Sequence, residues 1–535
     1  MTNIRIKIDK DDSRLMNLVS LFEVALKDHF QVGLELIDQD PFDVLLKIQS
    51  GIGDEGYTIS SEEPGPVCIA GNDLRGLTYG VGKFLRTSRV DGGHFSPSQW
   101  ASSLKPSCSF RGIYLATHFN NYYISAPITE VQQYLGDLLL WGYNVLGVTF
   151  PCEEFDGIDT PRAQKHIRRL KVILQSAKEI GFDVCILKAI NIGFKTAPKH
   201  VLAPPHPDDM KRRGYYGVRI CPSHEEGRTY LLRLWEEFWD EFSDVNIDYV
   251  EFWPYDEGGC GCEQCWPWGY RGFLDLSRDA FHTAKQRLPD IKCILSTWMF
   301  DTPEAGEWAG LSKALSSDRE RWVDYIMADS HEDFPRYPLE HDIKDEIGPS
   351  LLNFPEISMW GQSPWGGYGA NPLPQRFQRL WEQVRDRVDG GLPYSEGIFE
   401  DMNKILFSQW FWNPKRTADD ILTEYIEYEF SPSVVDEMLE CIHLLEAGHE
   451  RKNISGMSIQ AFDLLQQVER KLPQNIKKGW RWRILYLRGL IDKELFLHKG
   501  KRRGKVLGRC FKELVEIYHA QEARGSVKPS KAKRF

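Results

Sequence analysis

Two neighbouring carboxylates, Asp256 and Glu257, are the residues of this sequence that are best suited to chemistry. They end an apolar and aromatic run within residues 248–269, DYVEFWPYDEGGCGCEQCWPWG, and precede a turn rich in glycine and cysteine. Adjacent carboxylates in a partly dry site raise each other's proton affinity, so one can stay protonated while the other stays charged. The pair could therefore supply a general acid beside a fixed negative charge. In the alternative interpretation it is an ordinary Asp-Glu pair in a solvated loop.

Three cysteines follow directly, with the spacing C-x-C-x-x-C: Cys260, Cys262 and Cys265. Thiolates bind zinc, and three of them fill three corners of a tetrahedral site. The fourth ligand could be Cys221, in the segment ICPSHEEG, or the nearby His224. Such a zinc ion would be structural: it would hold the turn after the carboxylate pair and would not itself be the catalyst. A set of buried, reduced thiols in a tight turn remains the alternative.

Composition limits the classes of partner. The chain has 535 residues, of which 42% are hydrophobic and 27% charged, and its formal net charge is −11. This length exceeds what one hydrophobic core usually organises, so we expect two or three domains. The acidic balance argues against a nucleic-acid partner, which would need a basic face, and against an acidic polymer as substrate.

The sequence also predicts a compartment. The N-terminal segment MTNIRIKIDKDDSRL lacks the cationic start and apolar core of a signal peptide, and no apolar run is long enough to span a bilayer. The eleven cysteines are spread through a large chain, which is typical of free thiols in a reducing environment. We therefore expect a cytoplasmic protein with no membrane partner.

The apolar pattern predicts three regions. Residues 1–105 combine strand-like and helix-like runs in a small α/β domain, residues 106–412 alternate short strands with amphipathic helices, and residues 413–535 show helices alone. Eight β/α units are what a TIM barrel requires, whereas an open doubly wound sheet usually has fewer strands and a Gly-rich phosphate turn. We therefore predict a (β/α)8 TIM barrel with an N-terminal α/β domain and a C-terminal α-helical region. The strand candidates of the barrel are 110–116, 144–150, 183–189, 249–253, 292–298, 324–328, 356–360 and 391–395.

Residues next to these strands predict a carbohydrate site, because the active site of a TIM barrel lies at the carboxyl ends of its strands. They combine carboxylates for acid/base chemistry, aromatic surfaces for sugar rings and polar donors for hydroxyls. In the alternative interpretation they are structural, with the arginine as an ion-pair partner and the tryptophans as core. The candidate substrate-binding residues are Arg111, His118, Trp298, Trp360, Tyr394 and Glu396.

The layout resembles that of the glycoside hydrolase family 20 β-N-acetylhexosaminidases and their relatives, including the family 123 β-N-acetylgalactosaminidases. The shared features are the small α/β domain, a barrel that opens with an Arg-Gly strand (FRGIYLATHFNNYY), the segment WGYN at 141–144, and an Asp-Glu pair ending strand four. The segments GGCGCEQCWPWG, PWGGYGANPLP and YSEGIFEDMNK are not family 20 motifs.

This resemblance implies a substrate-assisted mechanism, in which the 2-acetamido oxygen of the sugar attacks its own anomeric carbon. It implies that Glu257 protonates the leaving oxygen and that Asp256 orients the acetamide. Arg111 would hold sugar hydroxyls, and Tyr394 would donate to the acetamide carbonyl. The other residues that would line the sugar subsite are Trp298, Trp360 and Glu396.

We therefore expect an exo-acting glycoside hydrolase that removes a terminal β-linked N-acetylhexosamine, with a β-N-acetylgalactosaminide favoured. Two alternatives stay open. An α-glucuronidase-like hydrolase shares the domain layout but needs cationic groups for the uronate, for which Arg111 is the only clear strand-end residue. A catalytically silent sugar-binding barrel would bind glycans without turnover. The expected partner is a carbohydrate, the chemistry requires no cofactor, and the C-terminal helices could form a homodimer contact.

Overall fold

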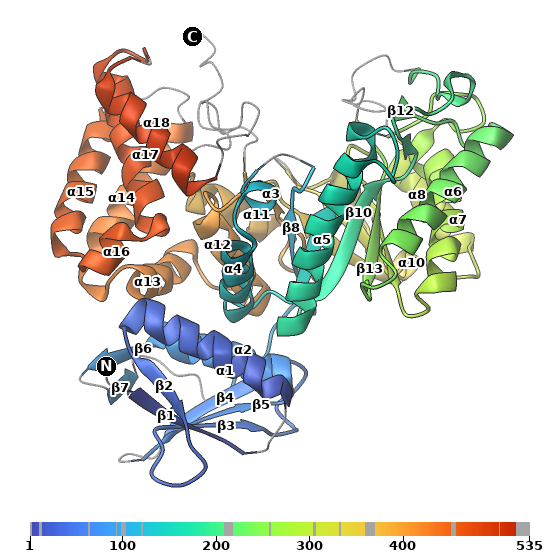
Figure 1. Ribbon diagram of the computed structural model, residues 1–535. Coiled ribbons are helices and arrows are strands. Elements are labelled where there is room, and N and C mark those ends of the chain that lie inside the picture. Colours follow the sequence, from blue (N-terminus) through green and yellow to red (C-terminus); the bar gives the residue numbers. More distant parts are fainter. Residues whose placement is uncertain are drawn as a thin grey trace.

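The computed structural model comprises an α/β region, a barrel and a helical region (Figure 1). In Figure 1 the α/β region lies below the barrel and the C-terminal helices lie beside it. No helix of the described part of the chain is long and apolar enough to cross a membrane. The domain limits at residues 105 and 412 stay a prediction. The structure describes all residues except 1–2, 10–12, 62–64, 92–93, 98–102, 119–120, 208–217, 256–257, 303–305, 331–332, 359–369, 451–455, 502 and 520–535.

The N-terminal region is a five-stranded sheet in the order β2-β1-β3-β5-β4, in which only β4 runs antiparallel to its neighbour. Alternation explains its first strand, because Ile4 and Ile6 are fully buried. The predicted mixture of strands and helices in this region is confirmed. Its elements are β1 (Asn3–Ile8), α1 (Ser13–Ala25), β2 (Gly33–Leu36), β3 (Val44–Ile48), β4 (Tyr57–Ser61), β5 (Val67–Gly71) and α2 (Leu74–Thr87), followed by the hairpin of β6 (Ser88–Asp91) and β7 (His94–Pro97).

The predicted TIM barrel is confirmed. Its parallel strands follow one another around the sheet, and the last of them pairs with the first, which closes the barrel. Such a barrel directs the carboxyl ends of all its strands to one face. The strands are β8 (Phe110–Leu115), β9 (Val145–Thr149), β10 (Asp183–Ala189), β13 (Tyr249–Trp253), β14 (Lys292–Ser296), β15 (Tyr325–Asp329), β16 (Ser350–Phe354), and the pair β17 (Gly390–Gly391) and β18 (Tyr394–Ser395).

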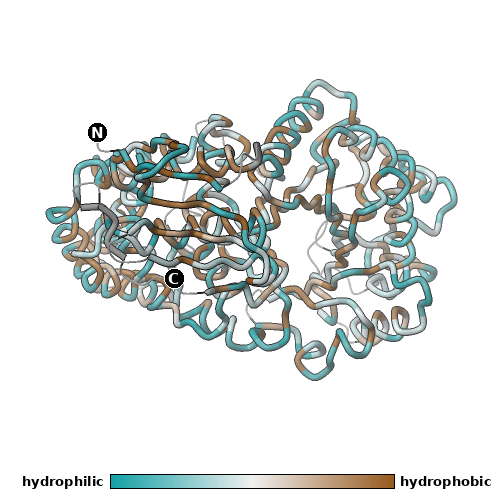
Figure 2. Tube along the Cα trace, turned by 90° about the horizontal axis from the view of Figure 1, so that it is seen from below, coloured by the Kyte–Doolittle hydropathy of each residue, from teal (hydrophilic) through white to brown (hydrophobic). Residues whose placement is uncertain are grey.

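Side chains fill the barrel interior in layers. Near the amino-terminal ends of the strands, the rings of Phe110, Tyr249 and Tyr325 meet with centroids 5.2 to 6.1 Å apart. Above this layer, Gly112 leaves the space that the side chain of Leu392 occupies. Figure 2 shows hydrophobic stretches within the molecule and hydrophilic turns along its outer helices. The barrel is therefore a packed core that carries a site at its end.

The last two barrel strands correct the prediction. The seventh strand, predicted at 356–360, is β16 at Ser350–Phe354. The apolar run of β16 is buried between two neighbouring strands, and residues 356–360 begin beyond its exit. The eighth strand is interrupted between β17 and β18 at Pro393, which has no N–H to donate to a strand ladder.

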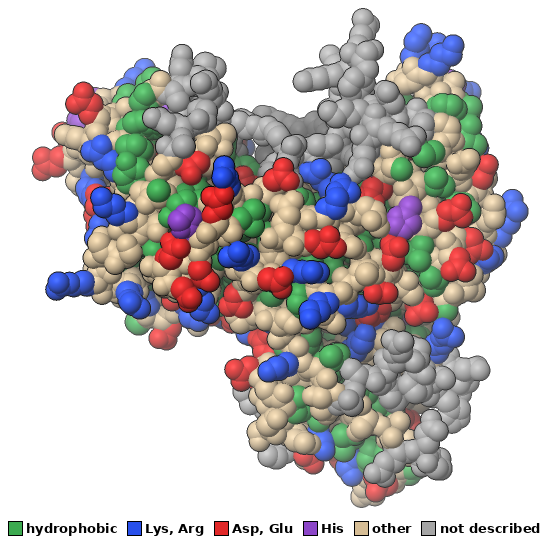
Figure 3. Space-filling view, turned by 180° about the vertical axis from the view of Figure 1, so that it is seen from behind, with side chains coloured by type: hydrophobic (Ala, Val, Ile, Leu, Met, Phe, Trp, Pro, Cys, Tyr) green, Lys and Arg blue, Asp and Glu red, His purple; other side chains and the backbone are tan. Residues whose placement is uncertain are grey.

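Amphipathic helices surround the barrel, and the sixth β/α unit has two short helices where the sequence shows no clear one. On the face in Figure 3, acidic and basic side chains are interspersed. The helices between strands are α3 (Tyr122–Ser125), α4 (Ile128–Leu140), α5 (Pro161–Ile180), α6 (Glu225–Glu241), α7 (Gly272–Arg287), α8 (Glu307–Ser317), α9 (Arg336–Glu340), α10 (Ile343–Ile347) and α11 (Pro374–Val384). After the last strand come α12 (Asp401–Trp412), α13 (Ala418–Glu429), α14 (Val435–Glu450), α15 (Met457–Lys471), α16 (Gln474–Lys478), α17 (Trp480–Leu497) and α18 (Lys505–Ile517).

An ion pair between the partly buried Glu55 and the buried Arg111 joins the N-terminal region to the start of the barrel. Arg111 is fully buried, and its guanidinium also donates to the carbonyl of Gly142 at 2.8 Å. Arg75 of α2 donates to Glu55 at 3.1 Å and to Asp183 at 2.5 Å. Burial acts to raise the pKa of Glu55, but the charges of Arg111 and Arg75 outweigh it and hold that pKa below its usual range. The carboxylate therefore stays charged at neutral pH.

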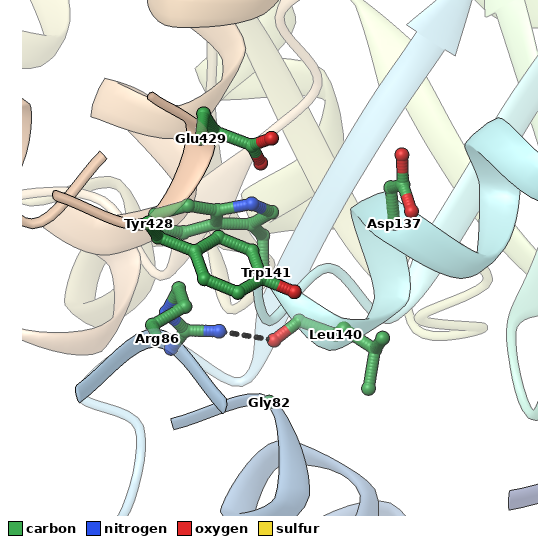
Figure 4. Close-up of a pocket in the computed structure, with 7 residues that line it drawn as sticks. All are labelled: Gly82, Arg86, Asp137, Leu140, Trp141, Tyr428 and Glu429. Carbon is green, nitrogen blue, oxygen red and sulfur yellow. Dashed lines mark hydrogen bonds between the residues drawn. The ribbon is translucent and has the colours of Figure 1, made fainter. Parts of the chain in front are cut away.

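The C-terminal helices meet the other two regions at a second junction, shown in Figure 4. Arg86 of α2 donates to the carbonyl of Leu140 at 2.5 Å, and its guanidinium lies 4.4 Å from the ring of Trp141. Tyr428 and Glu429 of α13 complete the wall of a cavity of about 10 Å³. That volume is close to what one water molecule needs. We conclude that this cavity belongs to the packing between regions and is too small for a substrate.

Substitution of Glu55 by Gln tests the first junction. Removing the carboxylate leaves the buried guanidinium of Arg111 without its counter-charge, and such a loss costs about 3–5 kcal/mol. We expect the free energy of unfolding, measured by urea denaturation, to fall by that order. The matched control is Glu340→Gln, which removes an exposed pair with Arg336 and should leave stability unchanged. Equal stability of Glu55→Gln and wild type would show that the junction does not depend on this pair.

Candidate active site

Aromatic side chains from five strands form a floor at the carboxyl-terminal face of the barrel. The rings of Trp253 and Trp298 stack with centroids 5.1 Å apart, and Phe354 lies 5.2 Å from Trp253 and 5.9 Å from Trp298. Tyr394 and Tyr114 continue the floor, with centroids 5.5 Å apart. We call Tyr114, Trp253, Trp298, Phe354 and Tyr394 the aromatic floor. Tyr114, Trp253, Trp298 and Phe354 are buried, and they pack at the end of the barrel where TIM-barrel active sites lie.

Polar groups stand at one side of this floor. The hydroxyl of Tyr394 donates to a carboxyl oxygen of Glu396 at 2.9 Å, and the hydroxyl of Tyr114 lies 3.2 Å from Nδ1 of His118. Burial lowers the pKa of His118 to about 4, with a contribution from His166, so the ring is neutral at pH 7. The structure therefore brings three of the predicted substrate-binding residues, His118, Tyr394 and Glu396, to one place.

Glu396 is a buried carboxyl that holds its proton at neutral pH. Burial raises the pKa of Glu396 to about 8, and the negative charge of Glu356 adds to this effect. Glu356 lies just beyond β16, forms a bridge with Tyr394, and accepts the backbone N–H of Ser358 at 2.7 Å. In such a buried pair of carboxyls, one can stay protonated and act as a proton donor while the other stays charged and accepts hydrogen bonds.

A further acidic residue, Glu400, holds the backbone of Glu396 in place. It accepts the backbone N–H of Glu396 at 2.6 Å and the hydroxyl of Ser358. Its other oxygen lies 3.9 Å from Nζ of Lys404, and both side chains are fully buried. The exit of β18 is thus fixed by hydrogen bonds to a residue that begins the next helix.

The carboxylates with the clearest predicted chemistry, Asp256 and Glu257, lie outside the described residues, as does Trp360, and their roles stay predictions. The chain on both sides of the pair is described. Before it, Nε1 of Trp268 donates to the carbonyl of Pro254 at 2.7 Å. After it, the N–H of Gly259 donates to the side chain of Asn191 at 2.8 Å. The chain is therefore anchored on either side of these two residues.

The four predicted zinc ligands come together in the structure. The sulfur atoms of Cys221, Cys260, Cys262 and Cys265 all lie within 4.8 Å of one another. Of the two candidates for the fourth ligand, Cys221 belongs to this cluster and His224 does not. The ring of His224 instead neighbours that of His200, with centroids 5.9 Å apart. All eleven cysteines are in the described part of the chain, and none forms a disulfide.

The structure corrects the prediction that Arg111 binds substrate. Its side chain is fully buried at the amino-terminal end of the barrel, where it pairs with Glu55 and lies 5.2 and 5.3 Å from the rings of Tyr79 and Trp412. The error arose because an arginine at the second position of a strand was assigned to the wrong end of that strand. Arg111 is a structural residue between regions.

Four residues of the site were not predicted: Tyr114, Trp253, Phe354 and Glu356. Tyr114 and Trp253 lie inside strands that were correctly placed, so the alternation of side chains could have assigned them to the interior. Phe354 and Glu356 were missed because the seventh strand was placed too late in the chain. With β16 at its observed position, Glu356 would have followed a strand exit and would have been a candidate.

No protein-family model matches this chain, and no curated protein sequence matches it. Solved structures match it in fold. A glycoside hydrolase family 115 4-O-methyl-α-glucuronidase with specificity for decorated arabinogalactans is 11% identical, with a TM-score of 0.63, and the match covers 100% of this chain and 78% of that one. A family 20 exo-β-N-acetylglucosaminidase from Vibrio harveyi is 13% identical, with a TM-score of 0.55, covering 83% of this chain and 74% of that one.

A family 89 glycoside hydrolase from Clostridium perfringens, in complex with GlcNAc-α-1,4-galactose, is 11% identical, with a TM-score of 0.61. The match covers 95% of this chain and 65% of that one. At such identities the likeness establishes the fold, and the chain therefore has the barrel architecture of these glycoside hydrolases. The resemblance to family 20 is supported at this level.

The protonation of Glu396 predicts how stability depends on pH. The folded protein binds this proton up to about pH 8, whereas the usual carboxyl releases it near pH 4.5. Between these values the folded state binds more protons than the unfolded chain, so stability falls as pH rises. Each unit of raised pKa corresponds to about 1.4 kcal/mol.

We expect Glu396→Gln to flatten this decline and to be at least as stable as wild type at pH 8. The measurement is a series of urea denaturation curves between pH 5 and pH 8. The control is Glu263→Gln, which removes an exposed carboxylate and should keep the wild-type slope. A variant of Glu396 with an unchanged slope would contradict the assignment of a raised pKa.

Proposed function

We propose that this protein is an exo-acting glycoside hydrolase that binds a terminal sugar over the aromatic floor and cleaves its glycosidic bond. One observation carries the proposal: an aromatic surface and a buried, protonated carboxyl meet at the carboxyl-terminal face of the barrel. Ring faces suit the apolar faces of a pyranose, and carboxyls suit its hydroxyls and its leaving oxygen. The shared architecture with solved glycoside hydrolases supports the same class of reaction.

The substrate that we favour is a terminal β-linked N-acetylhexosamine, with β-N-acetylgalactosaminide first among the candidates. Glu257 would protonate the glycosidic oxygen while the acetamido oxygen of the sugar attacks C1 and the C1–O bond to the leaving group breaks. Asp256 would hold the acetamide N–H and stabilise the positive charge that develops there. Glu257 would then take a proton from the water that opens the cyclic intermediate, which retains the configuration at C1.

The described residues would form the sugar subsite. Trp253 and Trp298, whose rings stack on each other and are each less than a tenth exposed, would lie beneath the sugar. Tyr394 and Glu396, already hydrogen-bonded to each other, would contact hydroxyl or acetamide groups. Because Glu396 is protonated at neutral pH, it can donate a hydrogen bond as well as accept one.

The α-glucuronidase alternative is favoured by the match to the family 115 enzyme, which covers 100% of this chain. It is weakened by the position of Arg111, the only strand-end cation named for the uronate, which lies at the opposite end of the barrel. A neutral sugar suits an aromatic floor flanked by a protonated carboxyl and a neutral imidazole better than a uronate does. We therefore keep the hexosaminidase first.

The test is hydrolysis of a panel of nitrophenyl glycosides that includes β-GalNAc, β-GlcNAc and α-glucuronide, with an unactivated disaccharide of the best sugar. We expect wild type to turn over a 2-acetamido sugar. Loss of the general acid in Glu257→Gln should lower the rate on the poor leaving group by about 10²- to 10⁴-fold. The matched control is Glu263→Gln, an exposed glutamate of the same turn, which should retain the wild-type rate.

Each contrary outcome has a definite meaning. Full activity of Glu257→Gln on the disaccharide would refute its role as the acid. Turnover confined to sugars without a 2-acetamido group would refute the substrate-assisted mechanism, and turnover of the glucuronide alone would establish the alternative. Glycan binding without turnover of any substrate would identify a catalytically silent barrel. Assembly as a homodimer and a cytoplasmic location stay predictions.

A further inference from the structure

Four cysteines from two distant segments meet beside the exit of the fourth barrel strand. Cys221 follows β12 (Val218–Arg219), and the other three lie on the turn after β13. The sulfur of Cys221 lies 3.5 Å from that of Cys260 and 3.7 Å from that of Cys262. All four sulfur atoms, including that of Cys265, are within 4.8 Å of one another.

These separations match a tetrahedral metal site. With Zn–S bonds of about 2.3 Å, the edges of a sulfur tetrahedron are about 3.8 Å long. A disulfide would instead bring two sulfurs to about 2.05 Å and leave the other two apart. Four thiolates in tetrahedral order select zinc or iron over harder cations. We propose that Cys221, Cys260, Cys262 and Cys265 bind one zinc ion.

The surroundings are those of a closed, structural site. Cys221, Cys260 and Cys265 are buried and Cys262 is partly exposed. The hydroxyl of Ser223 lies 3.0 Å from the sulfur of Cys221 and 3.1 Å from that of Cys262, where it can donate to a ligating thiolate. Four protein ligands leave no open position for water or substrate, so the metal would stabilise the structure and not catalyse.

Asn191 sets the two segments in register for a shared metal. It is fully buried, and its side-chain amide donates to the carbonyls of Ile220 at 2.9 Å and Gly259 at 3.0 Å. These two residues immediately precede Cys221 and Cys260. One amide therefore positions the residue before a cysteine on each segment, as a site with ligands from both would need.

Glycine permits the close approach of the turn. The N–H of Gly261 donates to the carbonyl of Pro204 at 3.2 Å, and a side chain at Gly261 would collide with the carbonyl of Pro205. Gly259 has φ of 117°, which favours glycine, and a side chain there would collide with the ring of His206. Gly259 and Gly261 thus allow the turn that carries the cysteines to pack closely against residues 204–206.

The metal would tie Cys221 to the described chain that begins at Gly258, directly after residues 256–257. Cys260 is three residues beyond Glu257, so the ion would fix the chain just after the proposed acid. The inference rests on sulfur positions and backbone contacts alone and does not depend on the proposed function. Metal content is measured without a substrate, so failure of one proposal leaves the other intact.

The experiment is metal analysis of the full chain, purified without chelator or added metal, by inductively coupled plasma mass spectrometry. We expect about one zinc per chain, as a closed four-cysteine site holds. Cys262→Ser changes the most exposed ligand and should lose most of the bound zinc. The matched control is Cys68→Ser, a half-buried cysteine of the N-terminal sheet, which should keep it. Exchange with Co²⁺ should give the absorption bands of a tetrahedral cobalt thiolate.

Four results would overturn the proposal. They are wild-type protein without stoichiometric metal, a full equivalent of iron in place of zinc, a cobalt spectrum that lacks thiolate charge transfer, and equal zinc loss from Cys68→Ser and Cys262→Ser. If Cys262→Ser does not fold, the metal content and the cobalt spectrum of wild type still decide the question. Circular dichroism of each variant separates loss of metal from loss of structure.

Discussion

Closure of the parallel barrel is the constraint on which the rest of the molecule depends. The first strand, β8, pairs with β9 on one side and with both pieces of the last strand, β17 and β18, on the other. Once closed, the sheet has two distinct ends, and every strand exit falls at the same one. The aromatic floor exists only because residues that are up to 280 positions apart in the chain, from Tyr114 to Tyr394, are brought to that end.

The two ends of the barrel differ in the charge state of their withdrawn side chains. At the amino-terminal end, the fully buried Arg111 and the partly buried Glu55 and Arg75 are charged partners, so their Coulomb attraction offsets the cost of withdrawing them from water. At the carboxyl-terminal end, Glu396 has a hydroxyl and other carboxyls around it, so burial favours its neutral form. Charged pairs fix the junction between regions, while the mouth of the barrel holds groups whose protonation can change. Perturbed carboxyls of this kind cluster at functional sites.

The described chain on both sides of residues 256–257 is held by hydrogen bonds to its surroundings. Asn191, the tryptophan that binds the carbonyl of Pro254, and the cysteine cluster Cys221, Cys260, Cys262 and Cys265 all anchor the chain around residues 256–257. Acid catalysis requires a proton donor that stays within hydrogen-bond reach of the leaving oxygen. If Glu257 is the proton donor that we propose, these contacts would help to position it, because misplacement by about 1 Å can cost two orders of magnitude in rate.

The order of apolar residues was enough to predict the TIM barrel, the N-terminal α/β region and the helical C-terminal region, because its period follows which positions are buried. The sequence also identified the four cysteines as a possible cluster, and it placed His118, Trp298, Tyr394 and Glu396 at strand exits. It misplaced the seventh strand and assigned Arg111 to the wrong end, since the partner of that side chain, Glu55, lies in another region. Three properties required the three-dimensional structure: which side chains meet at the mouth of the barrel, that Cys221 joins the other three cysteines, and which carboxyls are neutral. Those properties depend on distances and burial between residues remote in the chain, and local sequence patterns carry no record of them.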